Sequence, residues 1–144
     1  MNSKRIGNIT EMFVMLDILK LGYNVLTPYG DCERYDFVAD IGGKFYRIQV
    51  KTSREKNGVF EFSTASTHYL DGKCVHDTYK EDEIDFIATV HDNKSYLIPI
   101  NQCSTRASSL RFLPPKSGNQ KNIKYAKDYE LEKMIKKILD EQRQ

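Results

Sequence analysis

The feature that most constrains this chain is a pair of alternating runs, residues 35–41 and 44–52, on either side of Gly42-Gly43. Side chains alternate between the two faces of a strand, so each run has one largely apolar face and one face that carries its polar groups. A glycine pair is favoured in the tight turns that join antiparallel strands. The sequence therefore predicts a β-hairpin with one buried face.

The register of this hairpin brings polar residues onto one face. If the glycine pair forms a two-residue turn, counting outward from the turn places Asp36 opposite Gln49. Directly opposed residues have Cβ atoms about 4.5–5.5 Å apart, and Lys51 lies one diagonal step away on the same face. The alignment requires a regular hairpin, because a one-residue slip would move these side chains to opposite faces.

Other segments show helix and strand patterns in turn. Apolar residues recur at helical spacing from residue 8 to about residue 22, with Asn8 as the expected N-cap and Gly22 at the end. We expect short strands over 23–27, 59–64 and 110–113, a second hairpin over 84–100, an irregular polar loop over 67–83 and a C-terminal helix over 129–142. This order predicts an α/β fold, a central mixed β-sheet flanked by helices in a single domain.

The first predicted helix carries an acidic residue on an apolar face. Glu11 shares that face with Met15 and Ile18. Burying a carboxylate without a partner is costly, and a cation held between Glu11 and Asp36 would supply one. The alternative is that Glu11 only completes a capping box with Asn8.

These polar residues are suited to holding a hard cation. Magnesium prefers carboxylate and carbonyl oxygens together with water and phosphate. Glu11, Asp36 and either the side-chain carbonyl of Gln49 or the backbone carbonyl of Val50 would form a partial shell. Lys51 would orient the attacking water or stabilise developing charge. The sequence thus predicts a metal-dependent phosphodiesterase site at these residues; the simpler alternative for Asp36 and Lys51 is a cross-strand ion pair.

Several basic residues flank the predicted site and are candidates for phosphate contacts. They are Arg34, Arg47, Arg54 and Lys56. For each alone, a solvated surface position is an equally good interpretation. Asp85 precedes an apolar run, and we expect it to be a structural hydrogen-bonding group rather than a metal ligand.

Size and composition set broader limits. A chain of 144 residues fits a single domain over 1–144, with a core at about 7–100 and a C-terminal extension at about 101–144. The net charge of +2 permits an anionic partner without indicating one. Three cysteines without paired spacing favour reduced thiols. No apolar run reaches the ~18 residues of a membrane span, so we expect a cytoplasmic protein with no membrane association.

The runs Tyr-Asp-Phe at 35–37 and Arg-Ile-Gln-Val-Lys-Thr at 47–52 resemble the core of the PD-(D/E)XK nuclease superfamily, with glutamine in place of its second acidic residue. Within it, the chain looks most like small group I intron-encoded homing endonucleases with a Q-x-K motif and an acidic residue on the first helix. Related forms occur among Holliday junction resolvases. The resemblance covers about residues 7–100, although Pro28 stands eight residues before Asp36, so the literal Pro-Asp pair is absent.

The resemblance implies a restriction-endonuclease-like αβββαβ core, dependence on Mg²⁺ or Mn²⁺, and cleavage of double-stranded DNA to 5′-phosphate ends. One alternative is a structure-specific nuclease like the Holliday junction resolvases. Another is a catalytically silent DNA-binding or assembly module, because Gln49 adds no charge to the site. Cutting a duplex needs two active sites, so we expect a homo-oligomer, either a dimer or a tetramer.

Overall fold

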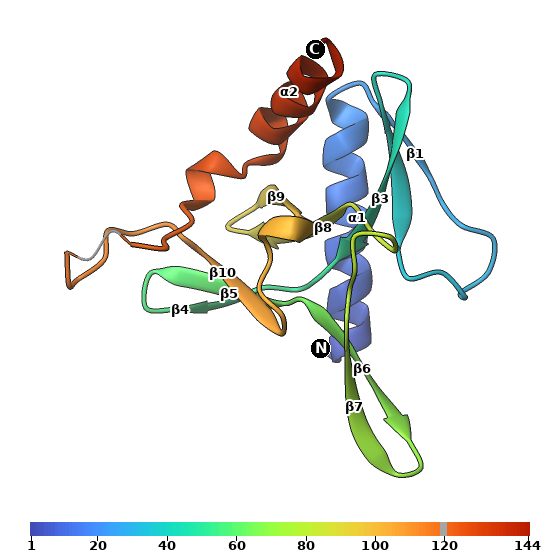
Figure 1. Cartoon of the computed structure of the whole chain (residues 1–144), viewed down its shortest axis with the longest axis vertical. Helices are drawn as coiled ribbons and strands as arrows, with labels where there is room; N and C mark the ends of the chain where they lie inside the picture. Colours follow the sequence, from blue (N-terminus) through green and yellow to red (C-terminus); the bar gives the residue numbers. More distant parts are fainter. Residues whose placement is uncertain (119–120) are drawn as a thin grey trace.

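A five-stranded mixed sheet forms the centre of the fold (Figure 1). The computed structural model describes residues 1–118 and 121–144, with all their side chains except that of His68. The strand order is β1 (Asn24–Leu26), β2 (Phe37–Ile41), β3 (Lys44–Val50), β8 (Phe86–His91) and β9 (Lys94–Pro99). Only β3 and β8 run parallel, and every other neighbouring pair in this sheet is antiparallel. The predicted α/β fold with a mixed sheet is therefore confirmed.

The predicted register of the β2–β3 hairpin is confirmed. Ile41 pairs with Lys44 and Phe37 pairs with Ile48, with no bulge between them. Both turn residues have left-handed backbones, with φ of 63° at Gly42 and 84° at Gly43. A side chain is unfavourable at such angles, which explains why this turn contains two glycines.

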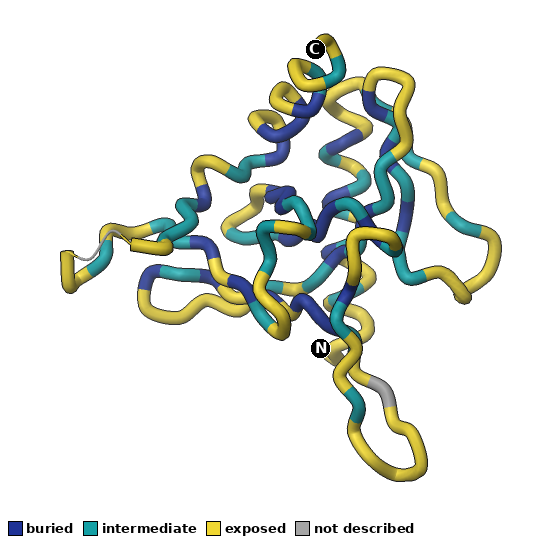
Figure 2. The backbone as a smooth tube through the Cα atoms, in the orientation of Figure 1, coloured by how far each residue is buried: buried dark blue, intermediate teal, exposed yellow. Residues whose placement is uncertain are grey.

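Both helices cover the same face of the sheet. α1 (Ser3–Lys20) contributes Val14 and Ile18 to the core, and α2 (Leu131–Gln142) contributes Met134, Ile135 and Ile138. The sheet residues that meet them are Phe37, Ala39, Ile41, Ile48, Val50, Phe86, Ala88 and Leu97. Figure 2 shows buried residues in the central strands and along one side of each helix. Neither helix of the described residues combines the length and apolar character needed to cross a membrane.

A second, smaller sheet covers the other face of β8 and β9. Its order is β10 (Ala107–Arg111), β5 (Val59–Ser63) and β4 (Arg54–Lys56). Phe60, Phe62 and Leu110 from this sheet pack against Ile87 and Ile98 of the central sheet. The strand expected over 110–113 thus begins and ends earlier than predicted. Two short 3-10 helices follow β9 and β10, at Ile100–Gln102 and at Ala126–Asp128, and the second is η2.

The predicted start of the first helix is wrong. α1 begins at Ser3, and the side chain of Asn2 caps it by accepting a hydrogen bond of 2.9 Å from Arg5 N. Once a helix has formed, adding residues to it is favourable, so the polar Asn8 does not interrupt it. Asn8 and Glu11 both lie inside the helix, and Glu11 is therefore not part of a capping box.

The irregular loop predicted over 67–83 is also wrong for most of its length. β6 (Ala65–Leu70) and β7 (Lys73–Thr78) form a hairpin around Asp71 and Gly72, which have φ of 52° and 75°. An Asp-Gly pair is a strong hairpin signal, but the flanking residues do not alternate in polarity because neither face packs on a core. The hairpin projects away from the rest of the fold (Figures 1 and 2).

The β2–β3 turn can be tested with two glycine substitutions. We expect Gly43→Ala to lower the free energy of unfolding by about 1–2 kcal/mol, because an alanine is unfavourable at a left-handed φ. Gly7→Ala, inside α1, is the matched control, since a Cβ there meets no heavy atom within 4 Å. It should raise the free energy of unfolding by about 0.5–1 kcal/mol. Urea unfolding followed by circular dichroism measures both, and equal effects would contradict this description of the turn.

Candidate active site

The candidate site lies where the β2–β3 hairpin ends, beside the first half of α1. Asp36 immediately precedes β2, and its N–H donates to Ile48 O at 2.8 Å. Lys51 immediately follows β3, and its N–H donates to Ala88 O at 2.9 Å. The backbones on both sides of the site are therefore fixed by neighbouring strands.

The carboxylate of Asp36 is held across the hairpin. Its Oδ2 accepts a hydrogen bond of 2.8 Å from Val50 N–H, which leaves Oδ1 as the oxygen for another ligand. Burial raises the pKa of Asp36, and the Val50 hydrogen bond and the charge of Lys51 lower it by a smaller amount. The carboxylate is oriented, but burial penalises its charge.

Glu11 on α1 is the second carboxylate of the site. Burial raises its pKa, and the negative charge of Asp36 raises it further. The two carboxylates are thus close enough to repel one another. Such a pair is stabilised by a cation placed between them.

Lys51 supplies the positive charge of the site. Its Nζ donates to Ala65 O at 3.4 Å and lies 5.0 Å from the centre of the Tyr79 ring. Burial lowers the pKa of Lys51, while Asp36 raises it and Arg34 lowers it. The ammonium group is therefore held close to Asp36 by contacts with the β6–β7 hairpin and with Tyr79.

Arg34 links the site to the base of the β6–β7 hairpin. Its guanidinium Cζ lies 4.4 Å from the centre of the Tyr79 ring, and its Nε lies 2.9 Å from Glu83 Oε2. Nη1 donates to Ser66 Oγ at 2.9 Å, and Nη2 donates to Asp77 O at 3.2 Å. The ring of Tyr79 is thus in contact with the cations of both Arg34 and Lys51. Sequence reasoning missed Tyr79 and Glu83, because both fall in the stretch that was assigned to a loop.

Gln49 lies on β3, and the register of the hairpin places it opposite Asp36. It is partly buried, and its backbone pairs with Ile87 of β8. Among residues 1–118 and 121–144, no group of three or more histidines, cysteines, aspartates and glutamates could hold a metal ion. A metal here would therefore have two carboxylate ligands, Glu11 and Asp36, and would need neutral oxygens from Gln49 and the Val50 carbonyl. Such an all-oxygen set fits the chemistry of Mg²⁺ or Mn²⁺.

Arg47 makes several contacts inside the molecule. Its Nε lies 3.1 Å from Asp85 Oδ2, and Nη1 donates to Asp82 O at 2.6 Å. Asp85 Oδ2 also accepts a hydrogen bond of 2.7 Å from Arg47 N–H. Asp85 therefore has the structural hydrogen-bonding role expected of it. Arg54 and Lys56 on β4 are exposed, whereas the guanidinium of Arg47 is held by contacts inside the molecule.

Comparisons with known proteins agree with this description. A family model described as PD-(D/E)XK endonuclease matches residues 1–132. Protein 5.3 of Escherichia phage T7 is 31% identical over 99 residues, covering 64% of this chain and 76% of that protein. A solved structure of a bacterial homing endonuclease, I-Ssp6803I, has a TM-score of 0.75 with 22% identity, covering 99% of each chain. At that identity, the structural likeness shows a shared fold.

The pKa shift of Glu11 predicts how stability depends on pH. Because the pKa of Glu11 is raised in the folded state, folding favours its protonated form, and that stability is lost as pH rises through the folded pKa. Glu11→Gln should therefore raise the free energy of unfolding near neutral pH. The gain should be at most about 1 kcal/mol, because solvent screens a half-exposed group.

The measurement is urea unfolding in metal-free buffer at about pH 7 and about pH 3.5, where wild-type Glu11 is protonated. The difference between Glu11→Gln and wild type should disappear at the lower pH. Glu33→Gln, at an exposed position, is the control and should change stability little at either pH. A wild-type protein more stable than Glu11→Gln at neutral pH would show that Glu11 is not destabilised by burial and Asp36.

Proposed function

Because the chain belongs to the PD-(D/E)XK endonuclease family, we propose that it is a metal-dependent endonuclease that hydrolyses phosphodiester bonds of double-stranded DNA. The observation that best supports this proposal is the convergence of Glu11, Asp36 and Lys51 at one end of the β2–β3 hairpin. Two neighbouring carboxylates beside a partly buried lysine form an arrangement suited to phosphate chemistry with a divalent ion.

In the proposed mechanism, Glu11 and Asp36 would hold Mg²⁺ or Mn²⁺ together with oxygens of Gln49 and Val50. When bound, such an ion supplies Lewis-acid polarisation of the scissile phosphate and a more acidic water. Lys51 donates a hydrogen bond to the attacking water or to a non-bridging phosphate oxygen, and its charge stabilises the extra negative charge of the transition state. The oxygen of the attacking water bonds to phosphorus while the bond from phosphorus to O3′ breaks, which gives a 5′-phosphate and a 3′-hydroxyl. The proton that the water loses passes to solvent, and the leaving 3′-oxygen takes a proton from solvent.

Gln49 reduces the negative charge of the proposed site. An acidic residue there would give three carboxylates, whereas glutamine leaves two and adds a neutral oxygen. Metal affinity depends on the number of charged ligands, so the proposed site binds its ion less tightly than a site with three carboxylates. Gln49 is also the feature that favours the second candidate, a catalytically silent DNA-binding module.

Basic residues beside the site are the proposed phosphate contacts. Arg54 and Lys56 are exposed on β4, which begins three residues after Lys51. Arg34 and Arg47 have partners inside the chain, so we propose that they add positive charge to this surface while fixing the loops around the site. Contacts of this kind strengthen binding to DNA of any sequence.

A second copy of the chain is the proposed partner of α1. Besides Ile6, which is 37% exposed, four apolar side chains on this helix are exposed by about half or more, namely Ile9, Met12, Leu16 and Leu19, at 51%, 67%, 51% and 46%. Their spacing of three, four and three residues is that of a coiled-coil seam. A two-fold pairing of this stripe would cover it and would bring two active sites together, one for each DNA strand.

Substitution of the site residues tests the nuclease assignment. Lys51→Ala and Asp36→Ala should each lower the rate of Mg²⁺-dependent plasmid cleavage by about 10²–10⁴-fold, because Lys51 stabilises charge on the reacting phosphate and Asp36 holds the ion. Lys44→Ala, at the exposed opposite end of β3, is the matched control and should cleave at the wild-type rate. Circular dichroism checks that each variant is folded.

Full cleavage by both Lys51→Ala and Asp36→Ala would contradict the proposed mechanism. Wild-type protein that binds DNA but cleaves none, with Mg²⁺ or with Mn²⁺, would instead favour the silent binding module. Four-way junctions tested beside linear and supercoiled DNA distinguish a junction-specific nuclease from one that cuts ordinary duplex.

The proposed dimer surface is tested by placing charges on α1. The double variant Met12→Lys, Leu16→Lys should weaken self-association by about tenfold or more, because it puts two ammonium groups into an apolar contact. Tyr29→Lys, at a fully exposed side chain outside α1, is the control and should leave the mass of the assembly unchanged. Light scattering measures the mass of each protein, and a wild-type mass equal to that of one chain would contradict the proposed dimer.

A further inference from the structure

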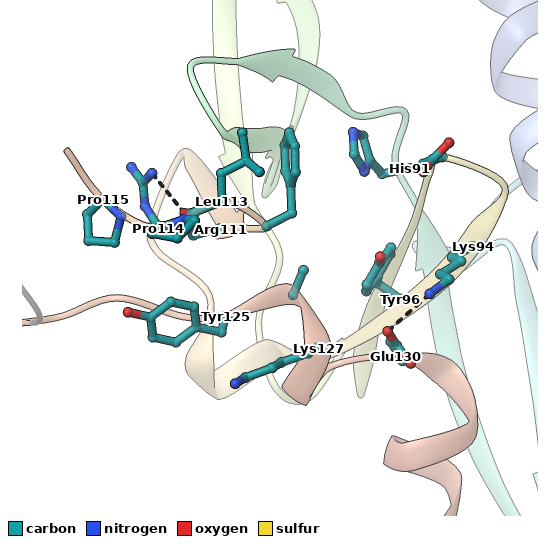
Figure 3. A pocket seen from close by; sticks show the side chains of 13 residues that line it. His91, Lys94, Tyr96, Arg111, Leu113, Pro114, Pro115, Tyr125, Lys127 and Glu130 are labelled. Carbon is teal, nitrogen blue, oxygen red and sulfur yellow. Dashed lines mark hydrogen bonds and ion pairs between the residues drawn. The ribbon is translucent and has the colours of Figure 1, made fainter.

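A cavity of about 550 Å³ lies outside the candidate active site (Figure 3). Its walls come from the β8–β9 turn, from the end of β10 and the residues after it, and from η2. Its volume falls within the roughly 300–1,000 Å³ typical of small-molecule sites. The cavity is lined by none of the four candidate active-site residues, Glu11, Asp36, Gln49 and Lys51. It is therefore a separate candidate binding site.

Aromatic rings form much of this cavity, and contacts behind them hold some of them in place. The ring of Phe112 lies 4.6 Å from that of His91, and Phe60 stacks behind His91 at 4.5 Å. Phe60 also lies 4.9 Å from the ring of Tyr96, another lining residue. Tyr125 lines a further part of the cavity. Rings at several sides provide flat apolar surfaces on which a planar group can stack.

The residues that line the cavity include both positively and negatively charged side chains. Lys94 Nζ lies 3.5 Å from Glu130 Oε1, and Figure 3 shows this pair at one end of the cavity. Arg111 and Tyr125 lie toward the other end in the same view, and Lys127 Nζ is 5.7 Å from the centre of the Tyr125 ring. The cavity thus offers a carboxylate at one end and cations that could meet an anion.

We propose that this cavity binds one nucleotide unit, an unstacked nucleobase together with its phosphate. The base stacks on the partly exposed ring of Phe112, and Glu130 accepts a hydrogen bond from an exocyclic amino group. Arg111 and Lys127 contact the phosphate. The unit is either part of an unpaired DNA strand or a free nucleotide, which share this chemistry. The proposal goes beyond the proposed cleavage reaction, and only its choice of a DNA strand as one source of the nucleotide rests on the phosphate contacts proposed above.

The surroundings of the cavity favour a nucleic-acid ligand. His91 Nε2 lies 2.8 Å from Glu55 Oε2, so the cavity wall is joined to β4. The residues on either side of Glu55 are Arg54 and Lys56, the exposed cations proposed above to contact phosphates. Side chains alternate along β4, so Arg54 and Lys56 lie on the face opposite to Glu55. These cations add positive charge near the cavity, which favours the approach of an anionic strand.

The test is a fluorescence titration with 2-aminopurine, a base analogue that carries an amino group and is quenched when it stacks. The probes are 2-aminopurine deoxyribonucleoside 5′-monophosphate, a short single strand with one such base, and a duplex with that base paired internally. The whole chain is used with a metal chelator, which prevents metal-dependent cleavage. We expect quenching of the first two probes. The base of the duplex is already stacked and quenched, and we expect its fluorescence to stay unchanged because it is not drawn out of the stack.

Two variants connect any binding to this cavity. Lys127→Glu reverses an exposed cation, and Phe112→Leu removes a ring while keeping apolar volume. Each should weaken probe binding by about tenfold, which is the effect of losing one good charge or stacking contact. Lys44→Glu, an equal charge reversal at the distant β2–β3 turn, should bind as wild type does. Thermal unfolding verifies that Phe112→Leu is folded.

Each outcome has a defined meaning. Quenching of the single strand alone identifies a DNA strand as the source of the nucleotide, and quenching of the mononucleotide alone identifies a free nucleotide. No quenching of either probe, or quenching unchanged in both Lys127→Glu and Phe112→Leu, would overturn the proposal. Because the titration involves no cleavage, its failure would leave the assignment of Asp36 and Lys51 untouched.

Discussion

The hydrogen bond from Val50 N–H to Asp36 Oδ2 is the contact on which the site depends. It joins the residue before β2 to the last residue of β3, and it requires the regular register of the β2–β3 hairpin. The bond orients a carboxylate whose pKa is raised by burial, and that carboxylate in turn raises the pKa of Glu11. The position of the Asp36 carboxylate, and its effect on the pKa of Glu11, therefore depend on the register that the Gly42-Gly43 turn sets.

The part of the site on the hairpin could be predicted from sequence, because register and strand parity are local properties. A two-residue turn at Gly42-Gly43 was enough to align Asp36 with Gln49 and Lys51. The start of α1 could not be predicted in the same way, since Asn2 and Asn8 are both possible caps and only the fold selects between them. Glu11 reaches the site through helix packing, which sequence spacing alone does not give.

The β6–β7 hairpin was missed because its strands face solvent on both sides and lack an alternating pattern. Without this hairpin, the sequence could not predict the contacts of Lys51 with Tyr79 and Ala65 or the partners of Arg34. The aromatic cavity was missed for a different reason. Its lining residues lie between positions 91 and 130, in segments whose individual patterns are unremarkable and which meet only in the folded chain.

The central claim is that Glu11 and Asp36 together hold a divalent ion. A titration with Mn²⁺, followed by electron paramagnetic resonance of the free ion, tests it without requiring a substrate. We expect one ion bound per wild-type chain and affinity about tenfold or more lower in both Glu11→Gln and Asp36→Asn, since each loses a charged ligand. Equal Mn²⁺ affinity in the wild type and both variants would contradict it.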